Sequence, residues 1–177
     1  MTESTRHLKN FERLRELNPL FRTKVLAVLS DLEGKGQRPY IATGYRSVAE
    51  QARKKAGGFS HVSFGLHNCS TPAGQPDSLA VDIVDADLLW DAPTSFWLEL
   101  ASAGEAHGLE SGALWGLSNA ARAKIRTLIH AKMWRVAIAL GWDVAHLQWK
   151  GISPAQAKAG VRPKATPSPK ATVSPKV

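Results

Sequence analysis

Apolar residues recur every three or four positions in several stretches of the chain, which is the spacing of an amphipathic helix. The helices expected from this pattern span residues 5–18, 20–33, 48–57, 93–107 and 119–140. The apolar face of the first helix consists of Leu8, Phe11, Leu14 and Leu17. The last helix is the longest, and its apolar positions extend to Val136 and Leu140.

Three other stretches are typical of β-strands. Residues 78–85 are expected to place Leu79, Val81 and Ile83 on one face of a strand and Ala80, Asp82 and Val84 on the other. The remaining strands are expected at 39–47 and 142–149, and residues 57–78 are predicted to form a long loop because Gly, Ser, Pro and Asn dominate them. A few strands mixed irregularly with helices indicate an α+β fold.

The composition changes near residue 155. From there the chain consists mainly of Pro, Lys, Ala, Ser and Thr, with almost nothing to bury, so residues 155–177 are predicted to be a disordered basic tail. The preceding residues 1–154 are enough for one domain, and a hydrophobic content of 44% over the whole chain allows a normal core.

The formal net charge of +8 suits binding to nucleic acid, anionic lipid or an anionic cell-wall polymer. Five of the lysines and arginines lie after residue 157, so the expected domain is less basic than the whole chain, which disfavours nucleic acid. Cys69 is the only cysteine, which excludes an internal disulfide and a zinc site built of several thiolates. Any metal site must therefore use His, Asp or Glu.

Three polar segments interrupt the apolar pattern: residues 43–47 with Gln51 after them, His67 with residues 79–83, and residues 141–148. Asp82 is the most informative residue, because it lies between aliphatic residues of an expected strand. A carboxylate buried there without a partner would be costly, so Asp82 is either exposed, paired with an arginine or bound to a cation. Two histidines and one carboxylate form a sound zinc-binding set that leaves a fourth position open.

These segments resemble the M15-type zinc peptidases, which include D-Ala-D-Ala carboxypeptidases and the L-alanyl-D-glutamate endolysins of bacteriophages. The resemblance covers roughly residues 38–149. It rests on Gly44-Tyr45-Arg46-Ser47, on His67 with the Asp82 strand, and on Asp143 with His146, in that order. The resemblance implies a small antiparallel sheet that carries a zinc site, flanked by the N-terminal helices and one longer inserted helix.

The resemblance also implies roles for individual residues. One Zn²⁺ per chain would be held by His67, Asp82 and His146, and Asp143 would be the general base. Arg46 would bind a substrate carboxylate or the developing oxyanion, with Gln51 assisting it. Among the six tryptophans, Trp115 and Trp149 are the candidates for stacking on the substrate. His61 remains an alternative metal ligand, and other divalent ions suit the same ligand set.

This sequence departs from the family pattern in three places. The step from His67 to Asp82 is fifteen residues, which is longer than usual, Gly65 replaces a serine, and Leu117 replaces a glycine after Trp115-Gly116. The longer loop between His67 and Asp82 and the helix expected at 119–140 are insertions relative to the family pattern. We expect them to alter the access of the substrate.

The resemblance leads to the hypothesis of a monomeric peptidoglycan peptidase that cuts the L-Ala–D-Glu bond of the peptide stem or a related bond. A D-Ala-D-Ala carboxypeptidase and a non-catalytic basic module that binds cell wall or nucleic acid remain alternatives. The basic tail would contact anionic wall polymers or lipid. No run of eighteen apolar residues and no secretory signal peptide is evident, so an enzyme made in the cytoplasm and released to the wall is expected.

Overall fold

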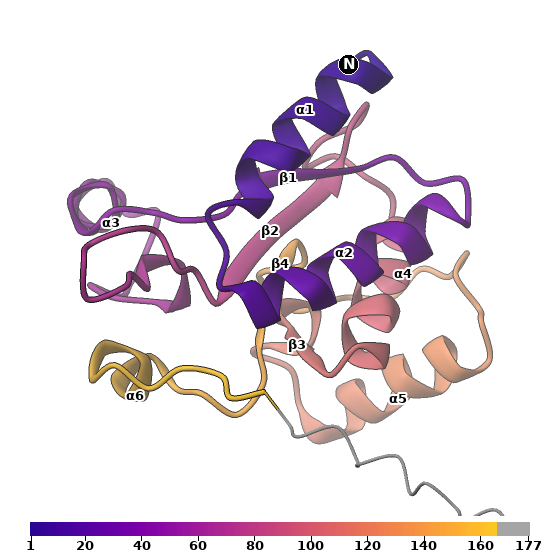
Figure 1. Cartoon of the computed structure of the whole chain (residues 1–177). Helices are drawn as coiled ribbons and strands as arrows, with labels where there is room; N and C mark the ends of the chain where they lie inside the picture. Colours follow the sequence, from indigo (N-terminus) through magenta and orange to yellow (C-terminus); the bar gives the residue numbers. More distant parts are fainter. Residues whose placement is uncertain (166–177) are drawn as a thin grey trace, which may run out of the picture.

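A four-stranded antiparallel sheet forms the centre of the protein (Figure 1). The computed structural model describes residues 1–165. The strands are β1 (Pro39–Thr43), β2 (Ala80–Asp85), β3 (Leu109–Ser111) and β4 (His146–Trp149), and they lie side by side in the order β1-β2-β4-β3. The expected α+β fold with a small antiparallel sheet is therefore confirmed. Strand β3 has only three residues, which is too short for an alternating pattern to reveal it in the sequence.

The two N-terminal helices are α1 (Glu3–Leu14) and α2 (Pro19–Glu33), close to the predicted ranges. The predicted apolar face of α1 is partly wrong, because Leu8 and Phe11 are 59% and 60% exposed. Asn10 is buried instead: it donates a hydrogen bond to the carbonyl of Pro39 and accepts one from the N–H of Ile41. The helix thus uses an amide side chain to satisfy the backbone of edge strand β1.

Helix α4 (Thr94–Ala106) is buried on two sides. Phe96 and Leu100 belong to the main core, which also contains apolar residues of α2 and of the sheet. Leu98 belongs to a second cluster, together with Ile125 of helix α5 (Asn119–His130). Gly104 permits the close packing, because a Cβ at this position would lie 2.6 Å from the Leu147 side chain. The helix therefore covers the face of the sheet opposite the polar residues of β2 and β4.

The long helix predicted over 119–140 is shorter in the structure. Helix α5 (Asn119–His130) ends in a Schellman motif, in which the N–H of Lys132 binds Ile129 and that of Met133 binds Leu128. Lys132 adopts the left-handed backbone conformation that such a motif requires, with φ of 53°. The residues that follow are extended, and their partly buried side chains alternate: Trp134, Val136, Ile138 and Leu140.

The chain beyond residue 154 also differs from the prediction. Helix α6 (Pro154–Lys158) begins with a capping box between Ser153 and Gln156. Arg162 then forms an ion pair with Asp77 at 2.6 Å and donates a hydrogen bond to the carbonyl of Ser70. These contacts fasten the chain up to Arg162 to the domain, although these residues were expected in the tail. The remaining part of the predicted tail, 166–177, lies outside the described residues.

One short helix and two 3₁₀ turns lie in the connections between the strands. Helix α3 (Val48–Ala56) starts with a capping box between Ser47 and Glu50, and a 3₁₀ turn, η1 (Leu66–Asn68), interrupts the predicted loop. A second 3₁₀ turn, η2 (Gly112–Leu114), follows β3. Over residues 1–165, none of the helices combines the length and the apolar character needed to cross a lipid bilayer.

Candidate metal centre and active site

Asp82 and His146 are direct cross-strand neighbours. Asp82 lies in β2 and His146 in β4, and the antiparallel register pairs the two residues. Such pairs project from the same face of a sheet with their Cβ atoms about 5 Å apart. The sheet register alone therefore brings together two residues that are 64 positions apart in sequence.

His67 reaches the same place from the 3₁₀ turn η1. Its own carbonyl accepts a hydrogen bond from the N–H of Arg46, and the Asn68 side chain donates one to the carbonyl of Arg46. The N–H of Leu79 binds the carbonyl of Leu66, which joins the turn to the start of β2. The turn is thus fixed to the segment after β1 and to the segment before β2.

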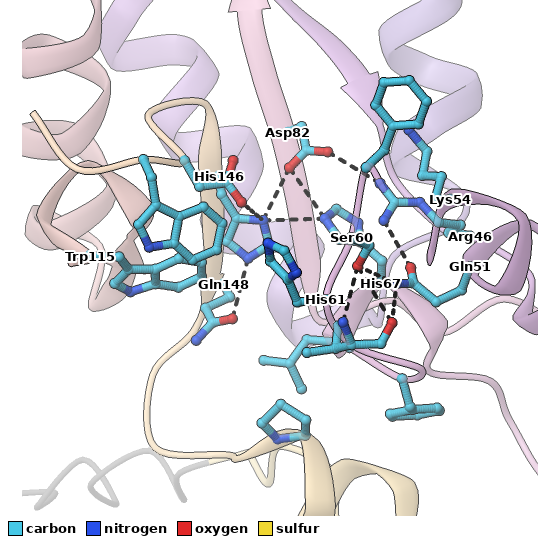
Figure 2. A pocket seen from close by; sticks show the side chains of 18 of the residues that line it. Arg46, Gln51, Lys54, Ser60, His61, His67, Asp82, Trp115, His146 and Gln148 are labelled. Carbon is cyan, nitrogen blue, oxygen red and sulfur yellow. Dashed lines mark hydrogen bonds and ion pairs between the residues drawn. The ribbon is translucent and has the colours of Figure 1, made fainter. Parts of the chain in front are cut away.

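The three side chains form a buried cluster (Figure 2). His67 Nε2 lies 3.2 Å from Asp82 Oδ1, and His146 Nδ1 lies 3.1 Å from the same oxygen. The two ring nitrogens are 3.3 Å apart. A tetrahedral zinc ion with bonds of about 2.0–2.1 Å separates its ligand atoms by roughly 3.3 Å. The cluster therefore has the spacing of a metal site.

Hydrogen bonds outside the cluster fix the tautomers of both histidines. His67 Nδ1 lies 2.7 Å from the carbonyl oxygen of Gly44, which can only accept, so Nδ1 carries the proton. His146 Nε2 lies 3.2 Å from Gln148 Oε1, and the Gln148 amide is oriented by donating to Glu110. His146 therefore carries its proton on Nε2.

The result is that unprotonated atoms face one another at the centre of the cluster. The lone pairs of His67 Nε2 and His146 Nδ1 both point toward the Asp82 carboxylate. Such a set is stabilised by a positive charge between its members, either a proton or a metal ion, and oriented hydrogen-bond partners of this kind are typical of metal-bound histidines. His67, Asp82 and His146 thus fit a divalent metal ion by distance, by burial and by protonation.

The electrostatics of the cluster favour a charged Asp82. Burial raises the pKa of this carboxyl, but the two histidines outweigh burial and hold the pKa well below its usual range. Burial lowers the pKa of His146, whereas the hydrogen bond and charge of Asp82 raise it above its ordinary value overall. The second oxygen of Asp82 faces Arg46 at 3.7 Å. An anionic Asp82 is the form that binds a cation.

Asp143 lies beside the cluster, with Oδ2 3.8 Å from His146 Nδ1. Burial raises the pKa of Asp143 above its ordinary value, against the opposing charge of His146. The backbone here approaches η2 closely: a Cβ on Gly112 would lie 2.2 Å from the Asp143 carbonyl oxygen, and a Cβ on Gly141 would lie 2.5 Å from the Gly112 carbonyl oxygen. Two glycines therefore allow Asp143 its position at the cluster.

Arg46 and Gln51 lie on the other side of Asp82. The Arg46 guanidinium donates a hydrogen bond to Gln51 Oε1 at 3.0 Å. Gln51 is buried, and its amide group donates to Ser60 and to the carbonyl of Val62. Gln51 thus orients Arg46 and also supports the loop after α3.

A cavity of about 600 Å³ opens over the cluster. Arg46, Gln51, Asp143 and Trp115 contribute to its lining. Figure 2 shows Trp115 on one side of the metal-binding residues and Arg46 on the other. Trp149 is not among the residues that line this cavity; its ring packs against the core and lies 5.1 Å from Lys24 Nζ. The structure therefore brings Trp115 to the cavity and places Trp149 elsewhere.

The alternative ligand His61 and the single cysteine, Cys69, both lie outside the cluster. His61 lines the cavity but does not belong to the cluster of His67, Asp82 and His146. Cys69 is fully buried, and burial raises the pKa of its thiol to about 11, so little reactive thiolate exists at neutral pH. Neither residue is part of the candidate metal centre.

Sequence reasoning assigned no role to Gln148, Glu110 and Trp142. Gln148 lies two residues after His146 in the same strand, so the period of two already places both on one face. Glu110 is the cross-strand neighbour of Gln148, but strand β3 was not predicted. Trp142 lines the cavity and packs against Trp115 with ring centroids 5.2 Å apart. The position of Trp142 directly before Asp143, a predicted catalytic residue, was the feature of the sequence that could have placed Trp142 at the site.

Comparisons with known proteins bear on the fold. No protein-family model matches the sequence, and no curated protein shows significant similarity to it. Among solved structures, the chain is similar to the L-Ala D-Glu endopeptidase ChiX from Serratia marcescens, with a TM-score of 0.53 and 17% sequence identity. The match covers 80% of this chain and 86% of ChiX. The predicted resemblance is therefore confirmed for the fold: this chain folds as an L-Ala D-Glu endopeptidase does, and its sheet carries a buried His-Asp-His cluster.

Proposed function

We propose that the protein is a zinc-dependent peptidase that cleaves the L-Ala–D-Glu bond, or a closely related bond, in the peptide stem of peptidoglycan. The observation that carries this proposal is the buried cluster of His67, Asp82 and His146 at the floor of a cavity, in a fold shared with an L-Ala D-Glu endopeptidase. Zinc is the proposed metal because two imidazoles and one carboxylate suit it and leave one position open.

The proposed mechanism assigns one task to each side chain. His67, Asp82 and His146 would hold the zinc ion, which would supply Lewis-acid activation of the scissile carbonyl and of water. Asp143 accepts a proton from the attacking water as the new C–O bond forms, and passes it to the departing amine when the C–N bond breaks. Its raised pKa suits this exchange, because a base with a pKa nearer neutrality also serves as an acid.

Arg46 is proposed to bind negative charge on the substrate. Its guanidinium lines the cavity and has Gln51 as an orienting partner. A planar guanidinium recognises a carboxylate or a developing oxyanion through paired N–H donors. Trp115 is proposed to contact the substrate from the opposite side of the cluster, where its ring lies 4.9 Å from the His146 ring.

Product analysis on purified muropeptides tests the proposal. The zinc-loaded protein is expected to split the stem between L-Ala and D-Glu, releasing a peptide with a new D-Glu amino terminus that mass spectrometry identifies. Release of free D-Ala would instead support a D-Ala-D-Ala carboxypeptidase. Intact muropeptides after incubation with the zinc-loaded protein would contradict a peptidase and leave a non-catalytic binding module as the remaining reading.

A further inference from the structure

The cavity above the metal-binding cluster has two unlike ends. One end is basic: Arg46 and Lys54 both line it, and Figure 2 shows them together on one side of Asp82. The other end is aromatic and is formed by Trp115 and Trp142. Figure 2 shows the cluster between Trp115 and Arg46, so a substrate that occupies both ends of the cavity passes over the cluster.

Trp142 presents an open ring at the aromatic end. It is 72% exposed although it lines the cavity. Its partner Trp115 is held by a hydrogen bond from its indole N–H to Glu110 at 2.9 Å. Gly116 makes room for Trp142, because a Cβ at Gly116 would lie 2.9 Å from the indole ring. The two indoles therefore form a supported surface with one face free for a ligand.

The aromatic surface lies within reach of the scissile bond. The Trp115 ring centroid is 4.9 Å from that of His146, and the Trp142 centroid is 5.2 Å from that of Trp115. One extended residue spans about 3.6 Å, so a group one or two units from the scissile carbonyl reaches the indoles. The ligand for Trp142 is therefore a group close to the cleaved bond.

The chemistry of the stem matches the two ends of the cavity. On the carboxyl side of an L-Ala–D-Glu bond the stem carries free carboxylates, which suit Arg46 and Lys54. On the amino side, the alanine is joined through a short lactyl group to an amino-sugar ring of the glycan. A pyranose ring presents a face of C–H groups, and the flat apolar face of an indole packs well against such a surface.

We propose that Trp142, supported by Trp115, binds the amino sugar that carries the peptide stem, so that glycan-linked stems are preferred over free stem peptides. This inference rests on the proposed function and fixes the direction of the substrate in the cavity. The sugar lies at the aromatic end, and the acidic residues of the stem lie at the basic end. Trp142 is thus a specificity-determining residue.

The test compares two substrates that share the same peptide: a disaccharide-linked stem and the free stem peptide. We expect Trp142→Ala to raise KM for the glycan-linked substrate roughly three- to tenfold more than it raises KM for the free peptide, which is the size of one aromatic contact. Trp142→Phe, which keeps an aromatic face, is expected to restore most of the difference. Trp90→Ala is the matched control, because Trp90 is exposed and lies outside the cavity lining.

Two outcomes separate failure of this inference from failure of the proposed function. Equal KM changes for both substrates, or no change for either, would overturn the sugar assignment while the peptidase activity stands. Hydrolysis of neither substrate by the wild-type protein would overturn the proposed function and this inference with it. Circular dichroism of each variant checks that the fold is kept.

Discussion

Replacement of Asp143 with asparagine is expected to lower kcat for stem cleavage by between about 100-fold and 10,000-fold, the range typical for loss of a general base. The amide has the shape of the carboxylate but cannot accept the proton from the attacking water. Asp143 Oδ2 lies 3.8 Å from a proposed metal-binding nitrogen and is not one of the three clustered residues. Metal content should therefore stay at the wild-type level.

The measurement is kcat and KM on a stem peptide, together with metal analysis of the same preparation. Asp91→Asn is the matched control, since Asp91 is an exposed aspartate outside the cavity lining. An Asp143→Asn protein that keeps both its metal and its full rate would remove Asp143 from the mechanism. Loss of the metal together with the rate would assign it to the metal site instead.

Replacement of any one of the three clustered side chains with alanine is expected to abolish metal binding and activity together. Loss of a residue that hydrogen-bonds to a metal ligand typically lowers metal affinity 10- to 100-fold, so loss of a ligand itself should lower it more than about 100-fold. The three single variants should also be similar to one another, because groups that act as a unit are not additive. The residues are His67, Asp82 and His146.

Thermal unfolding with and without added zinc measures this effect independently of activity. A ligand present at 100 times its Kd stabilises the folded protein by about 2.7 kcal/mol, so zinc should raise the melting temperature of the wild type and leave the three variants unchanged. His61→Ala is the decisive control, because His61 lines the cavity but lies outside the cluster. If His61→Ala loses the zinc response and His67→Ala keeps it, the ligand assignment is wrong.

The secondary structure followed from the sequence where local chemistry decides it. Helix α2 starts at Pro19 after the Asn18 cap, and β2 was visible as an aliphatic run that only Asp82 interrupts between residues 79 and 84. The prediction failed where tertiary contacts decide the outcome. Asn10 occupies the buried side of α1 because it satisfies the backbone of β1, a partner 31 residues away at Ile41. Helical spacing alone predicted that the apolar face with Leu8 and Phe11 would be buried.

The two errors near the C-terminus have similar causes. The apolar positions after His130 fit a helix at some spacings and a strand at others, and the Schellman motif at Lys132 decides for an extended chain. The composition after residue 154 has little to bury, but the Arg162–Asp77 ion pair spans 85 positions. Composition contains no information on such a partner.

The candidate site was more predictable than its surroundings. His67, Asp82 and His146 were proposed from motif order, and the sheet register and the turn at η1 bring them together. The partners that fix the histidine tautomers were not predictable. The Gly44 carbonyl belongs to the backbone, and Glu110 reaches Gln148 through a strand of three residues.

Anomalous diffraction at the zinc absorption edge, from crystals of the metal-loaded protein, is the most direct test of the metal centre. We predict a single strong peak per chain that lies within bonding distance of His67 Nε2, Asp82 Oδ1 and His146 Nδ1. A peak located away from these atoms, or no peak in zinc-soaked crystals, would contradict the proposed site and the hydrolytic function that depends on it.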